Sequence, residues 1–328
     1  MFLTMTPHVA IIDWRTAPQG DAESAVEKQI LAGTARVSRH LCETDADLEG
    51  EILDADAIIL WHNMPMSARG IAKLTNCRAI IRNGVGYDSV DVSAARDRGI
   101  AVCNVPDYGT EEVADHAIAL ALALCRQLFP LDAEAKALGW NIKVGPRLRR
   151  LGTLTFGVVG LGRIGTAAAL RAKALGFRVV FHDPYLPNGA DKAVGLARVR
   201  TLEDLLVETD VLSLHCPLNE ETRHLISERE LALLKPGAFV VNTARGGIIK
   251  KAAILAALRE GRLAGAGLDV IEDEPLRTEA EAATPNLIAT CHAAFCSVES
   301  KIEMRSTSAR IALAAVTGLP LENVVNGV

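Results

Sequence analysis

The sequence predicts an α/β protein with two doubly wound parallel-sheet lobes, the second inserted into the first. Short runs of β-branched and aliphatic residues alternate with segments of helical periodicity, which is the pattern of βαβ units in a parallel sheet. The alternation breaks after about residue 103 and resumes near residue 154. A length of 328 residues also favours two domains, since one core rarely grows beyond ~250–300 residues.

The first series contains four expected strands with three helices between them. The expected strands are Val9–Ile12, Ala57–Trp61, Arg78–Arg82 and Ile100–Cys103. The expected helices are Glu23–Leu31, Ser67–Leu74 and Ser89–Arg98.

A long helix follows, because apolar residues recur every three or four positions from Val113 to Leu128. The stretch Pro130–Leu151 loses this periodicity and contains Gly139, Gly145 and Pro146, so we expect an arm or connector there.

The second series contains six expected strands, and its helices begin after Gly162, Thr201, Ser227 and Lys250. The strands are Leu154–Val159, Arg178–His182, Val211–His215, Ala238–Asn242, Gly265–Asp269 and Leu287–Thr290. The last helix, Val298–Thr317, is expected to return to the first lobe. We therefore expect a first lobe of residues 1–103 and 294–328, and a second lobe of residues 104–293.

Composition argues against several classes of partner. Thirty-five Lys and Arg against 40 Asp and Glu leave a net charge of −5, which disfavours a nucleic-acid surface. The longest apolar run, Ile118–Cys125, is far shorter than the roughly 20 residues of a membrane span, and no signal peptide is recognisable. Seven scattered cysteines without a Cys-x-x-Cys pair fit a reducing, cytoplasmic setting and no metal.

A glycine-rich turn is the strongest local signal. Gly160, Gly162 and Gly165 form a G-x-G-x-x-G pattern that follows an expected strand and opens an expected helix, as in a dinucleotide-binding turn. The first glycine permits the tight turn, the second lets backbone N–H groups approach a pyrophosphate, and the third allows close helix–strand packing. Asp183 ends the next strand, where an acid accepts hydrogen bonds from a ribose and repels a 2′-phosphate. The sequence thus predicts NAD as the cofactor.

Polar residues also follow three later strands. Arg245 comes after one, Asp269 and the acids up to Glu274 after another, and His292 after a third. Ligands of open α/β sheets bind beyond these strand ends. Arg245 can hold a carboxylate and polarise a neighbouring carbonyl, and His292 can transfer a proton to or from a hydroxyl oxygen. A carboxylate on the other ring nitrogen would fix the tautomer, but spacing alone leaves Glu272, Asp273 and Glu274 open.

Over nearly its whole length the chain resembles the D-isomer-specific 2-hydroxyacid dehydrogenases, in the branch of the C-terminal binding protein corepressors and their bacterial relatives. The segments that carry this resemblance are Arg82–Asp88, Val102–Pro106, Glu111–Asp115, Gly160–Gly165, His182–Tyr185, His215–Asn219, Asn242–Gly247, Leu268–Val270 with Glu274–Pro275, and His292–Phe295. The resemblance implies a Rossmann cofactor domain inserted into a flavodoxin-like substrate domain, and a homodimer formed through the cofactor domains.

The resemblance also implies roles for particular residues. Its catalytic residues would be Arg245, Glu274 and His292. Its cofactor-binding residues would be Gly160, Gly162, Arg163, Ile164, Gly165, Asp183, Cys216, Pro217, Asn219, Thr243, Ala244, Asp269 and His292. The substrate would be held by Arg245 and His292, and by backbone N–H groups of a first-lobe loop formed by Arg82, Asn83, Gly84 and Val85.

The sequence departs from the family at a few positions and leaves the substrate open. Cys291 replaces the usual proline before the histidine, and Phe295 stands where the corepressors have tryptophan. We expect an enzyme that transfers a hydride between NAD(H) and a D-2-hydroxy acid/2-oxo acid pair, with glyoxylate, hydroxypyruvate and aromatic 2-oxo acids all open. The alternatives are an NAD(H)-sensing, corepressor-like interaction protein and a dehydrogenase of an unusual oxyanion donor.

Overall fold

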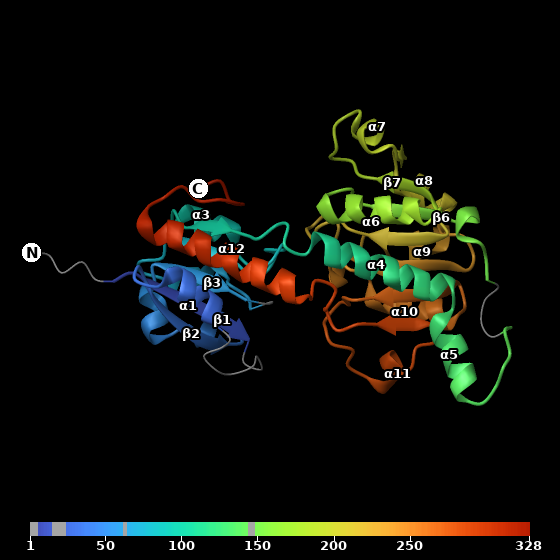
Figure 1. Cartoon of the computed structure of the whole chain (residues 1–328), viewed down its shortest axis with the longest axis horizontal. Helices are drawn as coiled ribbons and strands as arrows, with labels where there is room; N and C mark the ends of the chain where they lie inside the picture. The colour runs from blue at the N-terminus through green and yellow to red at the C-terminus, as the bar shows by residue number, and fades with distance from the viewer. Residues whose placement is uncertain (1–5, 15–23, 62–63, 144–147) are drawn as a thin grey trace, which may run out of the picture. The chain divides into compact units, whose positions relative to one another are not determined.

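The protein, seen here as a computed structural model that describes residues 6–14, 24–61, 64–143 and 148–328, divides into two compact units (Figure 1). Unit 1 comprises residues 1–108 and 297–328, and unit 2 residues 109–296. These divisions lie five and three residues after the expected ones at 103/104 and 293/294. At the first division, Asn104 N–H still donates to Asn323 O and Val105 N–H to Gly84 O, which keeps this segment in unit 1.

Unit 1 is a five-stranded parallel sheet in the order β2-β1-β3-β4-β5. Its strands are β1 (His8–Trp14), β2 (Arg36–Cys42), β3 (Ala57–Leu60), β4 (Ala79–Arg82) and β5 (Ala101–Cys103). Its helices are α1 (Ala25–Leu31), α2 (Ala68–Lys73), α3 (Val92–Asp97) and α12 (Val298–Thr317), with 3₁₀ turns η2 (Asp45–Asp47) and η3 (Gly50–Asp54). The expectation that the last helix returns to the first lobe is confirmed, since α12 packs on α1, β3 and β4.

Unit 2 is a seven-stranded parallel sheet in the order β12-β11-β10-β9-β6-β7-β8. Its strands are β6 (Thr155–Val159), β7 (Arg178–His182), β8 (Ala197–Arg198), β9 (Val211–Leu214), β10 (Ala238–Asn242), β11 (Leu263–Leu268) and β12 (Leu287–Ala289). Its helices and 3₁₀ turns are α4 (Thr110–Cys125), α5 (Leu128–Lys136), η4 (Leu151–Thr153), α6 (Arg163–Ala174), α7 (Ala190–Val194), α8 (Leu202–Glu208), α9 (Glu228–Leu233), η5 (Gly246–Ile248), α10 (Lys251–Arg259) and α11 (Glu279–Ala282).

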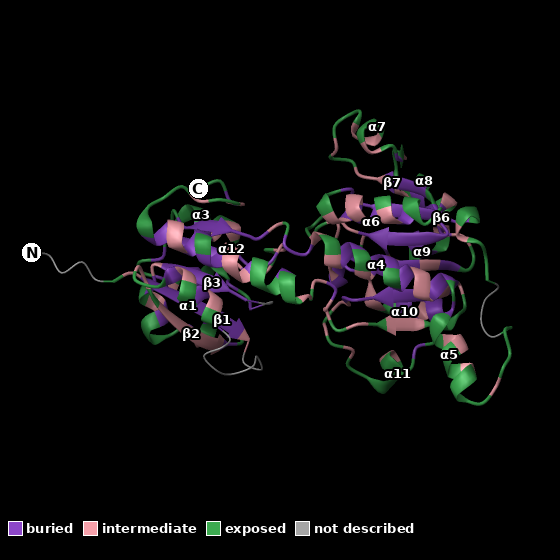
Figure 2. Ribbon diagram, viewed as in Figure 1, coloured by how far each residue is buried: buried purple, intermediate pink, exposed green. Residues whose placement is uncertain are grey.

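The cores explain why these elements form. In each unit the central strands are buried and the helices that pack on the sheet expose their outer side, whereas the outer strands β2, β8 and β12 are only partly buried (Figure 2). A sheet buried on both faces requires continuous apolar strands, and β3 (AIIL) and β9 (VLSL) have such sequences. The predicted fold class, two doubly wound α/β lobes, is therefore confirmed.

Several elements differ from expectation, among them β8, α7 and α11, which the sequence did not indicate. β2 was not anticipated, because its sequence RVSRHLC is rich in polar residues. The strand is only partly buried, which is typical of a strand at the edge of a sheet. The long helix ends at Cys125 instead of continuing to Leu128, since Gln127 takes a left-handed conformation with φ 52°. The expected connector begins instead as helix α5, which accommodates Pro130 in its first turn.

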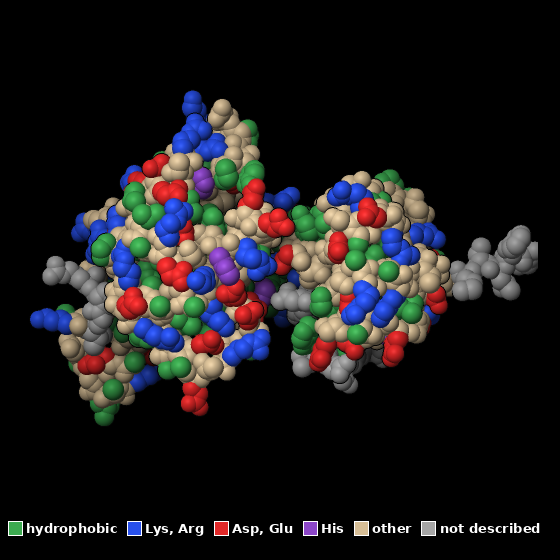
Figure 3. Space-filling model, turned by 180° about the vertical axis from the view of Figure 1, so that it is seen from behind, with side chains coloured by type: hydrophobic (Ala, Val, Ile, Leu, Met, Phe, Trp, Pro, Cys, Tyr) green, Lys and Arg blue, Asp and Glu red, His purple; other side chains and the backbone are tan. Residues whose placement is uncertain are grey.

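Among the described residues, no single helix has the length and apolarity to cross a membrane, and the pair α4 and α5, bent by 58°, meets that test on length and composition alone. Acidic and basic side chains alternate over the face of unit 2 that Figure 3 shows.

Candidate active site

The glycine turn lies between β6 and α6. Gly160 has φ 85°, and a Cβ there would lie 2.8 Å from the backbone N of Cys216. A Cβ on Gly165 would lie 2.1 Å from the Gly160 carbonyl oxygen, so both positions require glycine. Gly162 is the N-cap of α6, with no side chain capping the helix and nothing within 4 Å of a Cβ position. Arg163 and Ile164 begin the helix. A backbone cradle at an uncapped 12-residue helix fits a pyrophosphate.

Asp183 lies directly after β7, which is the neighbour of β6 in the sheet. Its Oδ2 accepts a hydrogen bond from Leu161 N–H at 2.9 Å, and its Oδ1 accepts one from Tyr185 N–H at 3.0 Å. The carboxylate is therefore held against the glycine turn. Each oxygen retains a lone pair, which is the arrangement a ribose hydroxyl requires.

The segment after β9 lies against the same turn, as the approach of Cys216 to Gly160 shows. Burial raises the pKa of the Cys216 thiol to about 11, so it is a neutral, weakly polar group. Pro217 is exposed, and the Asn219 side chain accepts from the N–H groups of Glu221 and Thr222. Asn219 thus shapes the loop that follows Cys216.

Three neighbouring parallel strands, β10, β11 and β12, end at one edge of the sheet. Thr243, Ala244 and Arg245 follow β10, Asp269 follows β11, and His292 lies three residues beyond β12. The Arg245 guanidinium donates to the Ala244 carbonyl oxygen at 2.8 Å. The buried Thr243 Oγ1 has no hydrogen-bond partner among the described residues, which is the kind of orphaned group a bound cofactor satisfies.

His292 and Glu274 are in direct contact. The Nδ1 atom of His292 lies 3.0 Å from Oε2 of Glu274, and both side chains are about one-third exposed. Of the three acids that spacing left open, Glu272 instead contacts His224 Nε2 at 2.5 Å, and Asp273 is exposed. The contact leaves His292 Nε2 available on the opposite side of the ring.

Asp269 holds the loop that carries His292. This buried carboxylate accepts from Thr290 Oγ1 at 2.6 Å and from the N–H groups of Ala293 and Ala294 at 2.9 and 3.0 Å. His116 Nε2 lies 3.0 Å from Thr290 Oγ1 and 3.7 Å from Asp269 Oδ1. Sequence reasoning missed Thr290 and His116, although Thr290 was placed at the end of an expected strand.

The Arg82–Val85 loop belongs to unit 1. Asn83 N–H donates to Leu60 O at 2.9 Å, and Gly84 N–H donates to Arg82 O at 2.8 Å. Two of the N–H groups expected to bind substrate are therefore already used within the unit. The Val85 carbonyl accepts from the Asn104 side chain at 2.7 Å, which fixes the far end of the loop. The Val85 N–H has no hydrogen bond within the described part of the chain.

A parallel sheet with a glycine turn, a ribose-type acid and polar groups at its carboxyl edge defines unit 2 as a dinucleotide-binding domain. Residues 118–294 match the family model described as D-isomer specific 2-hydroxyacid dehydrogenase, NAD binding domain. The chain belongs to this family, and its cofactor is NAD.

The curated relatives include a dehydrogenase and a C-terminal-binding protein. The chain is 35% identical over 304 residues to D-3-phosphoglycerate dehydrogenase of Methanocaldococcus jannaschii, covering 93% of this chain and 57% of that protein. It is 33% identical over 324 residues to C-terminal-binding protein 1 of Caenorhabditis elegans, covering 95% and 43%. The chain thus spans about half the length of these curated relatives.

Among solved structures, the chain is similar to D-lactate dehydrogenase from Aquifex aeolicus in complex with NAD and lactic acid. The TM-score is 0.84 at 28% identity, with 94% of this chain and 96% of that chain covered.

Proposed function

We propose that the protein is an NAD-dependent dehydrogenase that interconverts a D-2-hydroxy acid and its 2-oxo acid. The observation that carries this proposal is the 3.0 Å contact between His292 Nδ1 and Glu274 Oε2, at the edge of the NAD-binding sheet where Arg245 also lies. An imidazole held by a carboxylate and an arginine are the groups that proton transfer and carboxylate binding require.

The cofactor contacts follow from the geometry of unit 2. The turn Gly160–Gly165, including Arg163 and Ile164, holds the pyrophosphate, and Asp183 holds the ribose and disfavours a 2′-phosphate. Further contacts are assigned to Cys216, Pro217, Asn219, Thr243, Ala244, Asp269 and His292. NAD(H), when bound, supplies or accepts the hydride.

The side chains supply binding and proton transfer. Arg245 binds the substrate carboxylate and polarises the carbonyl through its planar fork of N–H groups. His292 Nε2 gives its proton to the carbonyl oxygen as the 2-oxo acid is reduced, and removes a proton from the hydroxyl in the reverse direction. Glu274 accepts from Nδ1–H, which directs the exchangeable proton to Nε2. The proposed reaction is balanced, because addition of one hydride and one proton converts the carbonyl to a hydroxyl.

The substrate class remains part of the proposal. Relatives named for D-lactate and D-3-phosphoglycerate favour a small 2-oxo acid, and glyoxylate, hydroxypyruvate and aromatic 2-oxo acids also fit the residues. The role of Arg82, Asn83, Gly84 and Val85 in binding the carboxylate stays a prediction, with the Val85 N–H as the group available for it.

The test is to follow NADH absorbance with purified protein across a panel of 2-oxo acids. We expect rapid oxidation with at least one acid, and its loss by on the order of 10²-fold or more in Arg245→Ala and His292→Ala. Lys250→Ala is the matched control, because this cation lies near Arg245 in sequence and pairs with Glu228. Tight NADH binding with no turnover of any acid would contradict the proposal.

The second candidate is an NAD(H)-sensing interaction protein, favoured by the 33% identity to a C-terminal-binding protein. It predicts NADH binding without rapid turnover, so the same assay separates the two. A dehydrogenase of an unusual oxyanion donor would use the same Arg245 and His292, and would be recognised by NAD⁺ reduction with that donor alone.

We further propose a homodimer formed through the cofactor domains, with a cytoplasmic location. The large apolar side chains of α5 and the segment after it support the dimer, since Leu138, Trp140 and Ile142 are 96%, 91% and 79% exposed. Exposed apolar surface of this kind marks an interface.

A further inference from the structure

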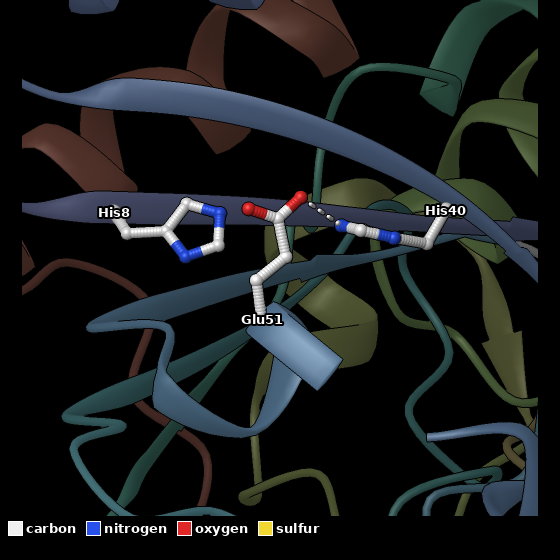
Figure 4. A group of neighbouring side chains, drawn as sticks. All are labelled: His8, His40 and Glu51. Carbon is white, nitrogen blue, oxygen red and sulfur yellow. Dashed lines mark ion pairs between the residues drawn. The ribbon is translucent and has the colours of Figure 1, made fainter. Parts of the chain in front are cut away.

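A second group of chemically active side chains lies in unit 1, on elements that the proposed dehydrogenase site does not use. His8 begins β1, His40 lies on β2 and Glu51 lies on η3. Figure 4 shows the Glu51 carboxylate between the two imidazole rings. One ligand atom from each side chain lies within 4.8 Å of the other two.

Strand pairing explains why these residues meet. β1 and β2 are parallel neighbours with His8 opposite Arg36. Because side chains alternate along a strand, Arg36, Ser38 and His40 lie on the same face of the sheet as His8. The chain leaves β2 and returns over this face as η3, which brings Glu51 to the histidines.

The contacts of His8, His40 and Glu51 meet beside the Ser38 hydroxyl. The Ser38 hydroxyl lies 2.7 Å from Nε2 of His8 and 2.7 Å from Nε2 of His40. Glu51 Oε1 lies 3.4 Å from His40 Nε2, while Glu51 Oε2 pairs with the Arg36 guanidinium. One carboxylate oxygen and two ring nitrogens therefore face the position next to the Ser38 hydroxyl.

We propose that His8, His40 and Glu51 bind a divalent transition-metal ion of the Zn²⁺, Co²⁺ or Ni²⁺ class. Two imidazoles with one carboxylate suit these ions, whereas Mg²⁺ and Ca²⁺ prefer oxygen ligands alone. Tetrahedral coordination at about 2.0–2.1 Å places ligand atoms roughly 3.4 Å apart. Side-chain movements of about 1 Å bring the three groups to that spacing.

The surroundings fit such an ion. His8 is buried and Glu51 is exposed, so the ion enters from the Glu51 side, where water completes the coordination. Because the three coordinating side chains come from β1, β2 and η3, metal binding stabilises unit 1 by an amount that rises with the logarithm of the free metal concentration.

The experiment uses the full chain without a histidine tag, after treatment with a chelator. Calorimetric titration with Zn²⁺ and visible absorption with Co²⁺ are expected to show one ion per chain. We expect affinity to fall about tenfold or more in His40→Ala and in Glu51→Gln. His224→Ala is the matched control, because it removes an exposed His–Glu pair in unit 2 and should leave binding unchanged.

Arg36→Gln gives a prediction that a purely structural hydrogen-bond cluster does not make. The guanidinium repels a cation and holds one Glu51 oxygen, so its removal should tighten metal binding. Equal affinity in wild type, His40→Ala and Glu51→Gln would mean adventitious surface binding and would overturn the proposal, as would no binding by the wild type. If His40→Ala fails to fold, Glu51→Gln decides, because its altered side chain is exposed.

Discussion

Glu274 contacts His292 Nδ1, the ring nitrogen that does not take part in the proposed proton transfer. In the proposed reaction Glu274 is therefore a positioning residue, which holds the tautomer and orientation of the imidazole. A glutamine at this position keeps the shape of the side chain but can present its amide NH₂ to Nδ1, which favours the opposite tautomer.

We therefore expect Glu274→Gln to lower kcat for the 2-oxo acid by on the order of 10²-fold or more, with NADH affinity unchanged. Steady-state kinetics and NADH fluorescence titration measure the two quantities. Glu272→Gln is the matched control, since Glu272 contacts His224 rather than His292. Wild-type kcat in Glu274→Gln would exclude the positioning role.

His215 provides a pH-dependent contribution to stability. Burial lowers the pKa of this ring to about 4, from 6.5 for the ordinary group, and its Nδ1 is buried without a partner among the described residues. The neutral ring is therefore favoured in the folded state. This contribution is fully present above pH 6.5 and is lost as the pH falls toward 4.

Denaturant unfolding at pH 7 and pH 4.5 tests this. Between pH 7 and pH 4.5 the free energy of unfolding should fall less in His215→Gln than in the wild type. The difference between the two falls should be up to about 3 kcal/mol. His224→Gln, at an exposed histidine, should retain the wild-type fall. An identical pH slope in His215→Gln and wild type would contradict the assignment.

For individual residues, the sequence indicated which side chains follow the strands, but not which contacts these side chains make. The positions of Arg245 and His292 after the ends of β10 and β12 could be predicted because both strands are apolar. The choice among Glu272, Asp273 and Glu274 depends on how a loop folds, which spacing does not encode. Asp269 was anticipated near the cofactor, whereas its hydrogen bonds to Thr290, Ala293 and Ala294 involve backbone N–H groups that have no sequence signature.

At the level of elements, α12 fixes the Arg82–Val85 loop from within unit 1. With the amide of Asn83 oriented to satisfy its neighbours, its nitrogen donates to Ser308 Oγ at 2.7 Å and to Met304 O at 3.3 Å. Its oxygen accepts from Trp61 Nε1 at 3.2 Å. Arg305 follows Met304 in α12, and its guanidinium lies 4.6 Å from the Trp61 ring centroid.

A double-mutant cycle measures the interaction between the Asn83 and Ser308 side chains. Asn83→Ala and Ser308→Ala should each destabilise the protein, by about 1–3 kcal/mol, because each leaves a buried polar group unpaired. The destabilisation of the double variant should be smaller than the summed destabilisation of the two single variants by at least about 0.5 kcal/mol. Strict additivity in denaturant unfolding would show that the two side chains do not interact.

Elements with apolar sequences were predictable, including the edge strands β5 and β12, whereas exposed elements with polar sequences were not. β9 and β10 are buried strands, and their expected ranges differ from the observed ones by at most one residue. β2 was missed because an edge strand buries little and has a polar sequence. α5 was missed because no residue in it is buried, which removes the apolar periodicity that identifies a helix.

At the level of the whole molecule, the fold class followed from the alternation of elements, while association depends on exposed surface. Among the described residues of unit 2, the most exposed large apolar side chains lie after α5, with Leu138 and Trp140 above 90%. Burying such side chains against a second copy removes apolar area from water.

We expect Trp140→Ser combined with Leu138→Ser to shift the protein from dimer toward monomer by at least tenfold in dissociation constant. Sedimentation velocity over a concentration series is the measurement. Leu319→Ser, an exposed apolar residue of unit 1, should leave the dimer intact. A wild-type chain that sediments as a monomer at all concentrations would refute the proposed homodimer.

The return of α12 to unit 1 has a consequence for synthesis on the ribosome. The helix packs on β3 and β4 and buries residues such as Met304, Ser308 and Ile311, yet it is translated after the whole of unit 2. Residues 109–296 are contiguous and emerge complete before it. Unit 2 can therefore fold during translation, whereas the nascent unit 1 keeps an apolar face open until α12 has left the ribosome. That interval is when a chaperone would bind.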